Sequence, residues 1–395
     1  MNGNSGQHAL RRDRLTLDRP LRVAVVYHLW PHYRSAVVAA MDKSTNIQYD
    51  FYGSGLPYQG IKHMAPESFR SFVKAPFRMV GRAMWQPKAV SAAVSGNYDA
   101  LIYLADLNFV STWVAAVLAR LRGRPVLFWA HGWLKPESGM KRRIRNLYFG
   151  LANRMMLYAE RGKRLGVAAG YPESQIAVIY NSLDVEAADS IVARIESGAL
   201  ASVRPQSLFA DPSLPLLICT ARITPLCRFD LLLKAADMLK AQGKPVNILL
   251  VGDGPERPPL EASAKELGLS VHFYGACYDE EITGQLIYHA DLTVSPGKIG
   301  LTAMHSLGYG TPAITHDNLD QQMPEVEALT DGVTGSLFRC DDASSLAAAI
   351  SDWLAAGRDR QVVRQNCRAA VHDRWNPDVQ AALIEQVILE VTGNA

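Results

Sequence analysis

Short apolar runs alternate with longer helix-like stretches along most of this 395-residue sequence, and the alternation occurs twice. Short runs rich in β-branched residues are typical of strands that are buried on both faces of a sheet. Strands and helices in alternation predict a parallel sheet covered by helices on both sides. The expected strands are residues 21–27, 99–104, 125–130 and 176–180 in the first half and residues 216–219, 246–251, 271–274 and 292–294 in the second half. The expected helices include residues 33–41, 110–121 and 141–169, and then residues 230–241, 259–267, 282–288 and 301–308.

The break between the two series predicts two domains joined by a linker. Residues 187–213 contain Pro205, Pro212 and several serines, a composition that suits a linker. A chain of this length fits two domains at a usual size of roughly 150 residues or somewhat more. We therefore expect a flexible N-terminus over residues 1–20, an N-terminal domain over 21–186, the linker over 187–213, a C-terminal domain over 214–374 and a last helix over 375–395.

Composition narrows the functional classes. Hydrophobic residues make up 48% and charged residues 20% of the chain, which is typical of a globular protein. The net charge of +3 is too small to imply nucleic-acid binding by itself. The five cysteines are odd in number and widely spaced, which favours neither a disulfide framework nor a zinc site and predicts a reducing cytoplasm.

No stretch predicts secretion or a membrane span. Residues 1–12 are polar and basic and lack the apolar core of a signal peptide. The most hydrophobic stretch, residues 100–121, contains Asp106, Asn108 and Arg120, so it predicts a buried strand and helix. We expect a cytoplasmic protein.

Three motifs follow one another in the second half: TARITP at 220–225, VGDGPE at 251–256 and SPGKIGLTAMHSLGYGTP at 295–312. In the first half, PHYR at 31–34, WAHG at 129–132 and VIYNSLD at 178–184 complete the set. In order and spacing these motifs resemble the family-4 retaining glycosyltransferases. The likeness covers residues 21–375, which is nearly the whole chain.

This resemblance implies a GT-B fold, an α/β architecture in which two Rossmann-like, doubly wound domains face each other across a cleft. The last helix would cross back to the N-terminal domain. The resemblance also implies that a sugar is transferred with retention from a nucleotide-diphosphate donor to a glycan or lipid-linked saccharide acceptor. The expected setting is cell-envelope polysaccharide synthesis in the cytoplasm.

The charge that develops on a departing diphosphate must be met by a metal or by fixed protein donors. No Asp-x-Asp pair occurs in the sequence, so we expect no metal and no other cofactor. Arg222, at the end of an expected strand, is the expected phosphate cation, with a surface ion pair as the alternative. The glycine-bearing loop 297–300 runs into a helix, and the amides of Gly300, Leu301 and Thr302 would bind an anion there unless the loop is an ordinary turn.

Some positions depart from the family. The family usually has two glutamates around this helix start, where this sequence has Gly297 and His305, and a lysine where it has Cys227. The resemblance implies that His305 hydrogen-bonds the donor ribose, that Gly297 offers its backbone and that Arg228 supplies the missing charge. The expected donor contacts are Arg222, Arg228, Gly252, Gly254, Gly297, Gly300, Leu301, Thr302 and His305. For Gly252 and Gly254 a purely structural turn is the alternative.

On the acceptor side, the resemblance implies that His131 lies against the donor sugar and that Tyr33 and Arg34 bind the acceptor. Asp106 would hold the acceptor hydroxyl or cap its own loop. The departing phosphate, rather than a side chain, would take the proton of the acceptor. Glu325 is a weaker candidate on the donor side, and a solvated loop carboxylate is the favoured interpretation.

Two basic clusters, residues 69–88 and 141–148, lie in the acceptor half. Both mix arginine and lysine with apolar side chains, which favours an anionic membrane surface over nucleic acid, with a solvated face as the alternative. For the whole chain, two alternatives to a transferase stay open. One is a non-catalytic pseudo-glycosyltransferase that binds a partner enzyme, and the other is a nucleotide-sugar epimerase or phosphorylase on the same fold.

Overall fold

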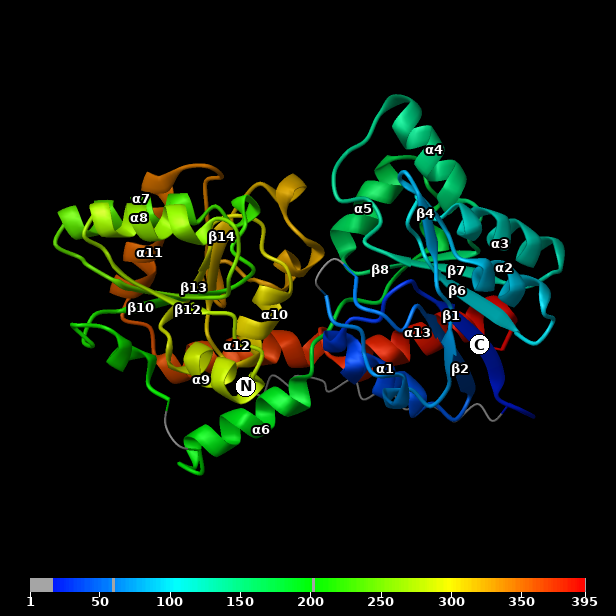
Figure 1. Cartoon of the computed structure of the whole chain (residues 1–395), viewed down its shortest axis with the longest axis horizontal. Coiled ribbons are helices and arrows are strands. Elements are labelled where there is room, and N and C mark those ends of the chain that lie inside the picture. Colours follow the sequence, from blue (N-terminus) through cyan, green and yellow to red (C-terminus); the bar gives the residue numbers. More distant parts are fainter. Residues whose placement is uncertain (1–16, 59–60, 201–202, 395) are drawn as a thin grey trace, which may run out of the picture.

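The computed structural model describes residues 17–58, 61–200 and 203–394. These residues form two α/β domains that lie side by side (Figure 1). Residues 1–16 of the expected N-terminus and residues 201–202 of the expected linker lie outside the described residues. Among the described helices, none combines the length and the apolar character that a membrane span requires.

The N-terminal domain is built on a seven-stranded sheet in which all neighbouring strands are parallel. The strand order is β3-β2-β1-β6-β7-β8-β9, so β1 lies between β2 and β6. The strands are β1 (Leu21–Val26), β2 (Ile47–Gly53), β3 (Phe72–Lys74), β6 (Ala100–Leu104), β7 (Val126–Ala130), β8 (Arg154–Leu157) and β9 (Ile176–Val178). Every residue of β7 is buried, which explains why such strands are continuous apolar runs in the sequence.

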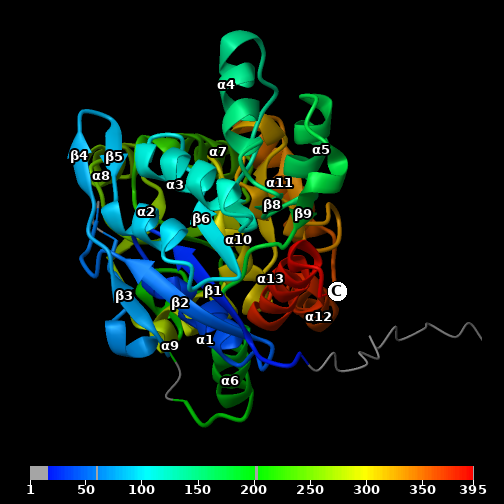
Figure 2. The same ribbon diagram turned by 90° about the vertical axis from the view of Figure 1, so that its right-hand side faces the viewer.

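Five helices and a small hairpin surround this sheet. The helices are α1 (Ser35–Asp42), α2 (Pro87–Val94), α3 (Val110–Leu121), α4 (Gly139–Phe149) and α5 (Glu160–Ala168). The hairpin consists of β4 (Arg78–Val80) and β5 (Ala83–Trp85), which pair antiparallel. Helix α4 projects from the domain, well away from the sheet (Figure 2).

The C-terminal domain repeats the plan with six parallel strands in the order β12-β11-β10-β13-β14-β15. The strands are β10 (Leu216–Thr220), β11 (Asn247–Val251), β12 (Ser270–Gly275), β13 (Leu292–Ser295), β14 (Ala313–His316) and β15 (Gly335–Phe338). The helices are α7 (Phe229–Ala241), α8 (Arg257–Glu266), α9 (Glu280–His289), α10 (Leu301–Gly308) and α11 (Ala343–Ala355).

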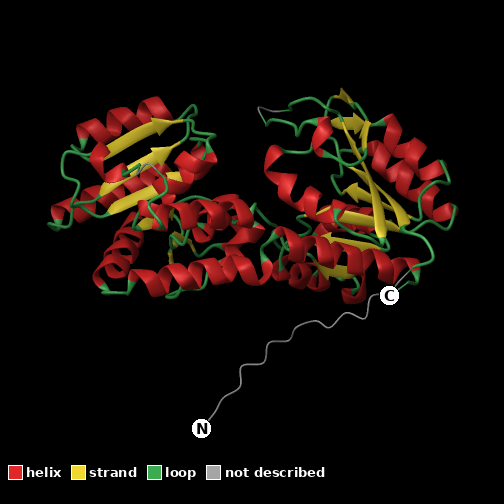
Figure 3. Cartoon of the chain, turned by 90° about the horizontal axis from the view of Figure 1, so that it is seen from below, coloured by secondary structure: helices red, strands yellow, loops and turns green. Residues whose placement is uncertain are grey.

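Three helices join or bridge the two domains. Helix α6 (Val185–Glu196) follows the first domain, and the Asp184 carboxylate caps it by accepting from the Ala187 amide at 2.9 Å. At the end of the chain, α12 (Arg360–Arg374) lies with the C-terminal domain and α13 (Pro377–Thr392) lies with the N-terminal domain (Figure 1). Seen from below, the two domains meet along one edge of the molecule (Figure 3). Helix α13 packs against α1, and its buried Ile384 and Ile388 belong to the N-terminal core.

The expected fold class, two Rossmann-like domains with parallel sheets, is confirmed. The expectation of one helical stretch over residues 141–169 is wrong, because β8 interrupts it between α4 and α5. The apolar run Met155–Leu157 is too short to separate from a helical pattern by periodicity alone. Strands β14 and β15 and the β4-β5 hairpin were also not expected from the sequence.

Candidate active site

In both domains, candidate residues follow the strands at which the strand order reverses. Strand β10 lies between β11 and β13, and β1 lies between β2 and β6. The loops after such strands leave a crevice at the carboxyl edge of the sheet, where open α/β sheets bind ligands. Arg222 follows β10 and the loop 297–300 follows β13, while Tyr33 and Arg34 follow β1 and Asp106 follows β6.

The loop after β13 brings free amides to this edge. Gly300 is the N-cap residue of α10, and within the described ranges no acceptor is found for the amides of Gly300, Leu301 and Thr302. The Thr302 hydroxyl donates to the carbonyl of Thr220 at 3.0 Å, which ties the first turn of α10 to the end of β10. Such a helix N-terminus attracts an anion through its amides and its dipole.

Gly297 has no room for a side chain. A Cβ at this position would lie 1.9 Å from the carbonyl oxygen of Leu226. The Gly297 amide donates to the carbonyl of Cys227 at 3.0 Å, so the turn Pro225–Cys227 packs directly against the loop. This packing gives a physical reason for the missing glutamate and leaves Gly297 only its backbone.

Gly252 and Gly254 lie so close to the backbone of residues 221–223 that neither position has room for a side chain. A Cβ would lie 1.9 Å from the Ala221 carbonyl oxygen at Gly252 and 2.1 Å from the Ile223 carbonyl oxygen at Gly254. The amide of Ile223 donates to the carbonyl of Asp253 at 3.0 Å, so the two segments run edge to edge. This packing favours the structural alternative for both glycines, which hold the segment that carries Arg222.

Two cations beside the free amides have no partner. Arg222 and Lys298 are both exposed, and neither side chain forms a hydrogen bond or an ion pair with any residue that the structure describes. No motif in the sequence pointed to Lys298, although Lys298 lies inside the glycine loop. Arg228 differs, because its guanidinium bonds to the carboxylates of Asp230, at 3.0 Å, and Asp341. These carboxylates compete with any phosphate for Arg228.

His305 meets a carboxylate that the sequence analysis missed. Its Nε2 lies 2.8 Å from Oε1 of Glu280, in the first turn of α9, and the Tyr309 hydroxyl donates to the same oxygen at 2.8 Å. Burial alone would raise the pKa of Glu280, but the contacts to His305 and Tyr309 outweigh it and leave the pKa below its usual value. Glu280 is far from residue 305 in sequence, so only the fold reveals this pair.

His131 follows β7 and lines a pocket between the two domains. Its ring meets the ring of Tyr158 edge to face, with centroids 5.0 Å apart. Atoms of both domains crowd the imidazole, and this desolvation, together with the cations of Arg34 and Lys298, lowers its pKa. A lowered pKa leaves the imidazole of His131 neutral at pH 7.

Arg34 is a cation held without a carboxylate. Its guanidinium donates to the Tyr158 hydroxyl and lies 5.4, 5.0 and 5.6 Å from the ring centroids of Tyr27, Trp129 and Tyr158. One guanidinium nitrogen, Nη1, is buried without a hydrogen-bond partner. Tyr33 beside it is half-buried. Aromatic faces stabilise the charge of Arg34, so the acceptor half keeps a positive charge behind His131.

Asp106 takes one of the two roles expected for it, whereas Glu325 differs from the favoured interpretation. The Asp106 carboxylate accepts from the amide and the side chain of Asn108, both at 2.9 Å, so it caps its own loop. Glu325 is not a solvated carboxylate, since only 2% of it is exposed and its Oε1 accepts from Asn181 at 2.6 Å. Burial raises the pKa of Glu325, against the lowering effect of the Asn181 bond.

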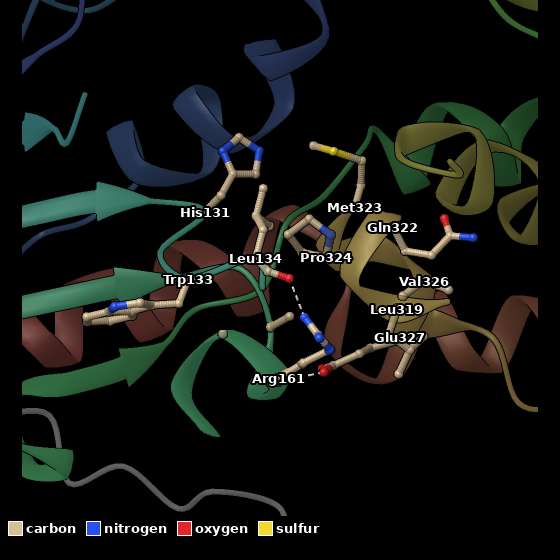
Figure 4. A pocket seen from close by; sticks show the side chains of 12 residues that line it. His131, Trp133, Leu134, Arg161, Leu319, Gln322, Met323, Pro324, Val326 and Glu327 are labelled. Atoms are coloured by element: carbon tan, nitrogen blue, oxygen red, sulfur yellow. Dashed lines mark hydrogen bonds between the residues drawn. The ribbon is translucent and has the colours of Figure 1, made fainter. Parts of the chain in front are cut away.

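The two halves of the site meet in one pocket. His131 and Met323 lie at one end of it, and Arg161 and Glu327 lie at the other (Figure 4). The Met323 side chain also lies 3.4 Å from the position that a Cβ on Gly300 would take. Met323 therefore lies near both His131 and the N-terminus of α10. Among the described residues, no three His, Cys, Asp or Glu side chains come together as metal ligands would.

Residues 204–370 match the family model of glycosyl transferases group 1. Over 142 residues the chain is 30% identical to a GDP-mannose-dependent alpha-(1-6)-phosphatidylinositol dimannoside mannosyltransferase of Mycobacterium tuberculosis, an alignment that covers 35% of each protein. The chain thus spans about a third of the length of this curated relative.

Solved structures resemble nearly the whole chain. The Anabaena protein HepE in complex with UDP has a TM-score of 0.69 and 17% identity, over 94% of this chain and 100% of that one. The lipopolysaccharide outer core galactosyltransferase WaaB has a TM-score of 0.69 and 13% identity, over 94% and 99%. Residues 204–370 are therefore similar to a glycosyl transferases group 1 domain, and the whole chain shares the GT-B fold of these solved structures.

Proposed function

We propose that this chain is a retaining glycosyltransferase that moves a sugar from a nucleoside-diphosphate donor to a glycan or lipid-linked acceptor. The observation that supports this most directly is the N-terminus of α10, where three free amides lie beside the unpaired cations Arg222 and Lys298. Free amides and unpaired cations are what a diphosphate requires. The glycosyl transferases group 1 match covers all of these residues.

The site suits a reaction in which the phosphate itself takes part. The bond between the anomeric carbon and the phosphate oxygen breaks, and the acceptor oxygen bonds to the same face of the sugar. The acceptor proton passes to the departing phosphate oxygen. The α10 amides, Arg222 and Lys298 stabilise the negative charge that grows on the diphosphate. His131, neutral at pH 7, can hydrogen-bond the sugar without repelling the positive charge on the anomeric carbon.

A donor panel tests this proposal. The curated relative is named for GDP-mannose and HepE binds UDP, so both GDP-sugars and UDP-sugars belong in the panel. We expect one donor to release its nucleoside diphosphate in the presence of a saccharide acceptor, with the same rate in EDTA. Loss of activity in EDTA with rescue by Mn²⁺ would contradict the metal-free mechanism. Nucleotide binding without turnover would favour the pseudo-glycosyltransferase, and sugar interconversion without release would favour the epimerase.

We further propose a cell-envelope acceptor at an anionic membrane surface. Helix α4 supports this, because Met140, Ile144 and Leu147 expose 65%, 46% and 67% of their surface. These three residues lie one turn apart along one helix face, and Lys141, Arg142 and Arg143 are exposed between them.

The other basic cluster, residues 69–88, presents less apolar surface than its sequence implies. Phe72 and Phe77 are half-buried and Met84 is buried, whereas Met79, Val80 and Trp85 are exposed on the hairpin. Within the cluster 141–148, Arg145 turns inward and pairs with Glu137 at 2.6 Å. The apolar face of α4 is thus the better membrane candidate.

A further inference from the structure

Helix α5 begins without a cap of its own. Its N-cap residue, Ala159, has no side chain that could accept a hydrogen bond. The carboxylate of Glu327, from the other domain, accepts from the amides of Glu160 and Arg161 at 2.9 and 2.6 Å. Free amides at a helix start need an acceptor, and a carboxylate there is also favoured by the helix dipole. The C-terminal domain therefore completes a helix of the N-terminal domain.

Residues 319–328, which we call the interdomain strap, carry two more such contacts. The Arg161 guanidinium bonds to the carboxylate of Asp320. It also donates to the carbonyl of Leu134 (Figure 4). Asn181, in the segment that leaves the N-terminal domain, donates to Glu325 at 2.6 Å. Three carboxylates of one short segment thus bind groups outside their own domain.

The interdomain strap is also bonded to the donor loop. The Gln322 Oε1 accepts from the Ile299 amide at 2.7 Å, and the Met323 amide donates to the Ile299 carbonyl at 3.3 Å. The Gln322 side chain is held in turn by Thr315 and His316, to which its Nε2 donates at 2.9 Å. Because Ile299 lies next to the free amide of Gly300, the strap and the phosphate loop form one hydrogen-bonded unit.

We propose that the interdomain strap couples nucleotide binding at the α10 N-terminus to closure of the two domains, with Glu327 as a releasable cap on α5. The nucleotide part of this inference rests on the proposed function, and the closure part rests on the contacts alone. The strap lines the same pocket as His131, so its contacts set how far His131 lies from the α10 N-terminus. Glu327 is a positioning residue in this scheme, since it acts through α5.

The contacts suit reversible closure. The side chains of Arg161, Asp320 and Glu327 keep 17%, 47% and 20% of their surface exposed. Water and salt screen ion pairs of this kind, which usually contribute little each, and a helix cap adds a modest amount. A few such contacts can break and re-form in each catalytic cycle without unfolding either domain.

Small-angle scattering and calorimetry on the full chain test the inference. We expect Glu327→Ala to have a larger radius of gyration than the unsubstituted chain, with Glu327→Gln between them because it keeps one acceptor oxygen. Coupling is reciprocal, so the affinity of Glu327→Ala for UDP or GDP should fall roughly 5-fold or more. The matched control is Glu173→Gln. It breaks the 3.1 Å ion pair between Glu173 and Lys163 of α5, and it changes no contact with the C-terminal domain. It should change neither quantity.

A folded Glu327→Ala protein with unchanged dimensions and unchanged nucleotide affinity overturns the inference. If Glu327→Ala fails to fold, Asp320→Asn, which removes one partly exposed ion pair, must show the same two changes to a smaller degree. If neither nucleotide binds the unsubstituted chain, the proposed donor and the coupling are both wrong. In that case small-angle scattering alone tests whether the strap holds the two domains closed. An unchanged radius of gyration in Glu327→Ala would then reject this part of the inference as well.

Discussion

Three glycines on the donor side are fixed by backbone packing. A Cβ at Gly252, Gly254 or Gly297 would lie about 2 Å from a carbonyl oxygen, a distance that no side chain can take without moving the neighbouring segment. These glycines place the two unpaired cations, Arg222 and Lys298, at the edge of the sheet. Arg222 and Lys298 therefore supply the positive charge for a diphosphate, and the tightly packed glycines set the positions of these two cations.

Arg222→Ala should weaken binding of the nucleoside diphosphate by roughly 1.5–3 kcal/mol, which is the usual size of a charge-assisted hydrogen bond. Isothermal calorimetry with UDP and GDP measures this change. Arg122→Ala, at the end of α3 in the other domain, is the control and should bind like the unsubstituted chain. An unchanged affinity of Arg222→Ala would remove Arg222 from the site.

His305→Ala should raise the Michaelis constant for the donor more than it changes turnover, because ribose contacts are similar in the ground and transition states. The resemblance alone implies that glutamate would be tolerated at this position. The structure changes that expectation, since a glutamate would face Glu280, whose Oε1 lies 2.8 Å from the present imidazole. His305→Glu should lower the melting temperature, whereas His305→Gln, which keeps a donor for Glu280, should not. Equal melting temperatures for both variants would contradict this.

Glu325 predicts a pH dependence of stability. Burial raises the pKa of Glu325 in the folded state above the ordinary glutamate value of 4.5, so folding favours its protonated form. Its contribution is fully present below pH 4.5 and is lost as pH rises through the folded pKa. Glu325→Gln removes this loss and keeps the acceptor for Asn181. Glu325→Ala leaves Asn181 buried without a partner, at a cost of about 1–3 kcal/mol.

Urea unfolding between pH 4.5 and pH 8 checks these expectations for Glu325. The stability of the unsubstituted chain should fall with pH more steeply than that of Glu325→Gln. At pH 7 the glutamine variant should be at least as stable as the unsubstituted chain. Identical pH slopes for the two proteins would show that Glu325 does not titrate in this range.

At the scale of elements, α4 makes the membrane proposal specific. The chain should bind phosphatidylglycerol vesicles but not phosphatidylcholine vesicles, and salt should weaken the binding because it screens the cations. Replacing both Ile144 and Leu147 by serine should weaken binding roughly 10-fold or more, from the transfer energy of two apolar side chains. Leu121→Ser is the control, since Leu121 is 79% exposed at the end of α3 and lies outside both basic clusters. Vesicle co-sedimentation measures all three, and equal losses in the two variants would reject α4.

Strands that form a continuous apolar run between turns could be predicted from the sequence, whereas a short strand between two helices could not. The run over residues 126–130 is buried along its whole length and was expected as a strand. Strand β8 has four residues between two helices, and its Met155 and Met156 suit a helix as well as a strand, so the pattern did not separate it. In the site, local motifs identified Arg222 and His131. Glu280 and Glu327 act across long sequence separations, so no local pattern could reveal them.

The whole molecule closes on itself through its last helix. Helix α13 follows the C-terminal domain in sequence but packs against α1, and Ile384 and Ile388 are fully buried in the N-terminal core. Gln380 adds polar contacts, since its Nε2 donates to the Tyr180 carbonyl at 2.5 Å and its Oε1 accepts from Ser182 at 2.7 Å. The core of the N-terminal domain is therefore complete only when α13 is in place, and the same helix holds residues 180–182, which lead out of that domain.

Ile384→Ala should thus destabilise the domain that is farthest from it in sequence. Truncating a fully buried isoleucine costs about 2–5 kcal/mol through lost burial and the cavity left behind. Ile144→Ala is the control, because Ile144 is 46% exposed on α4 and should change stability by no more than about 0.5 kcal/mol. UDP or GDP binds the C-terminal domain in our proposal, so the affinity of Ile384→Ala for the nucleotide should stay the same while its thermal unfolding begins earlier. Differential scanning calorimetry with and without nucleotide separates the two domains. If Ile384→Ala instead lowers the nucleotide-sensitive transition and leaves the other unchanged, α13 stabilises the C-terminal domain and the assignment of this helix to the N-terminal core is wrong.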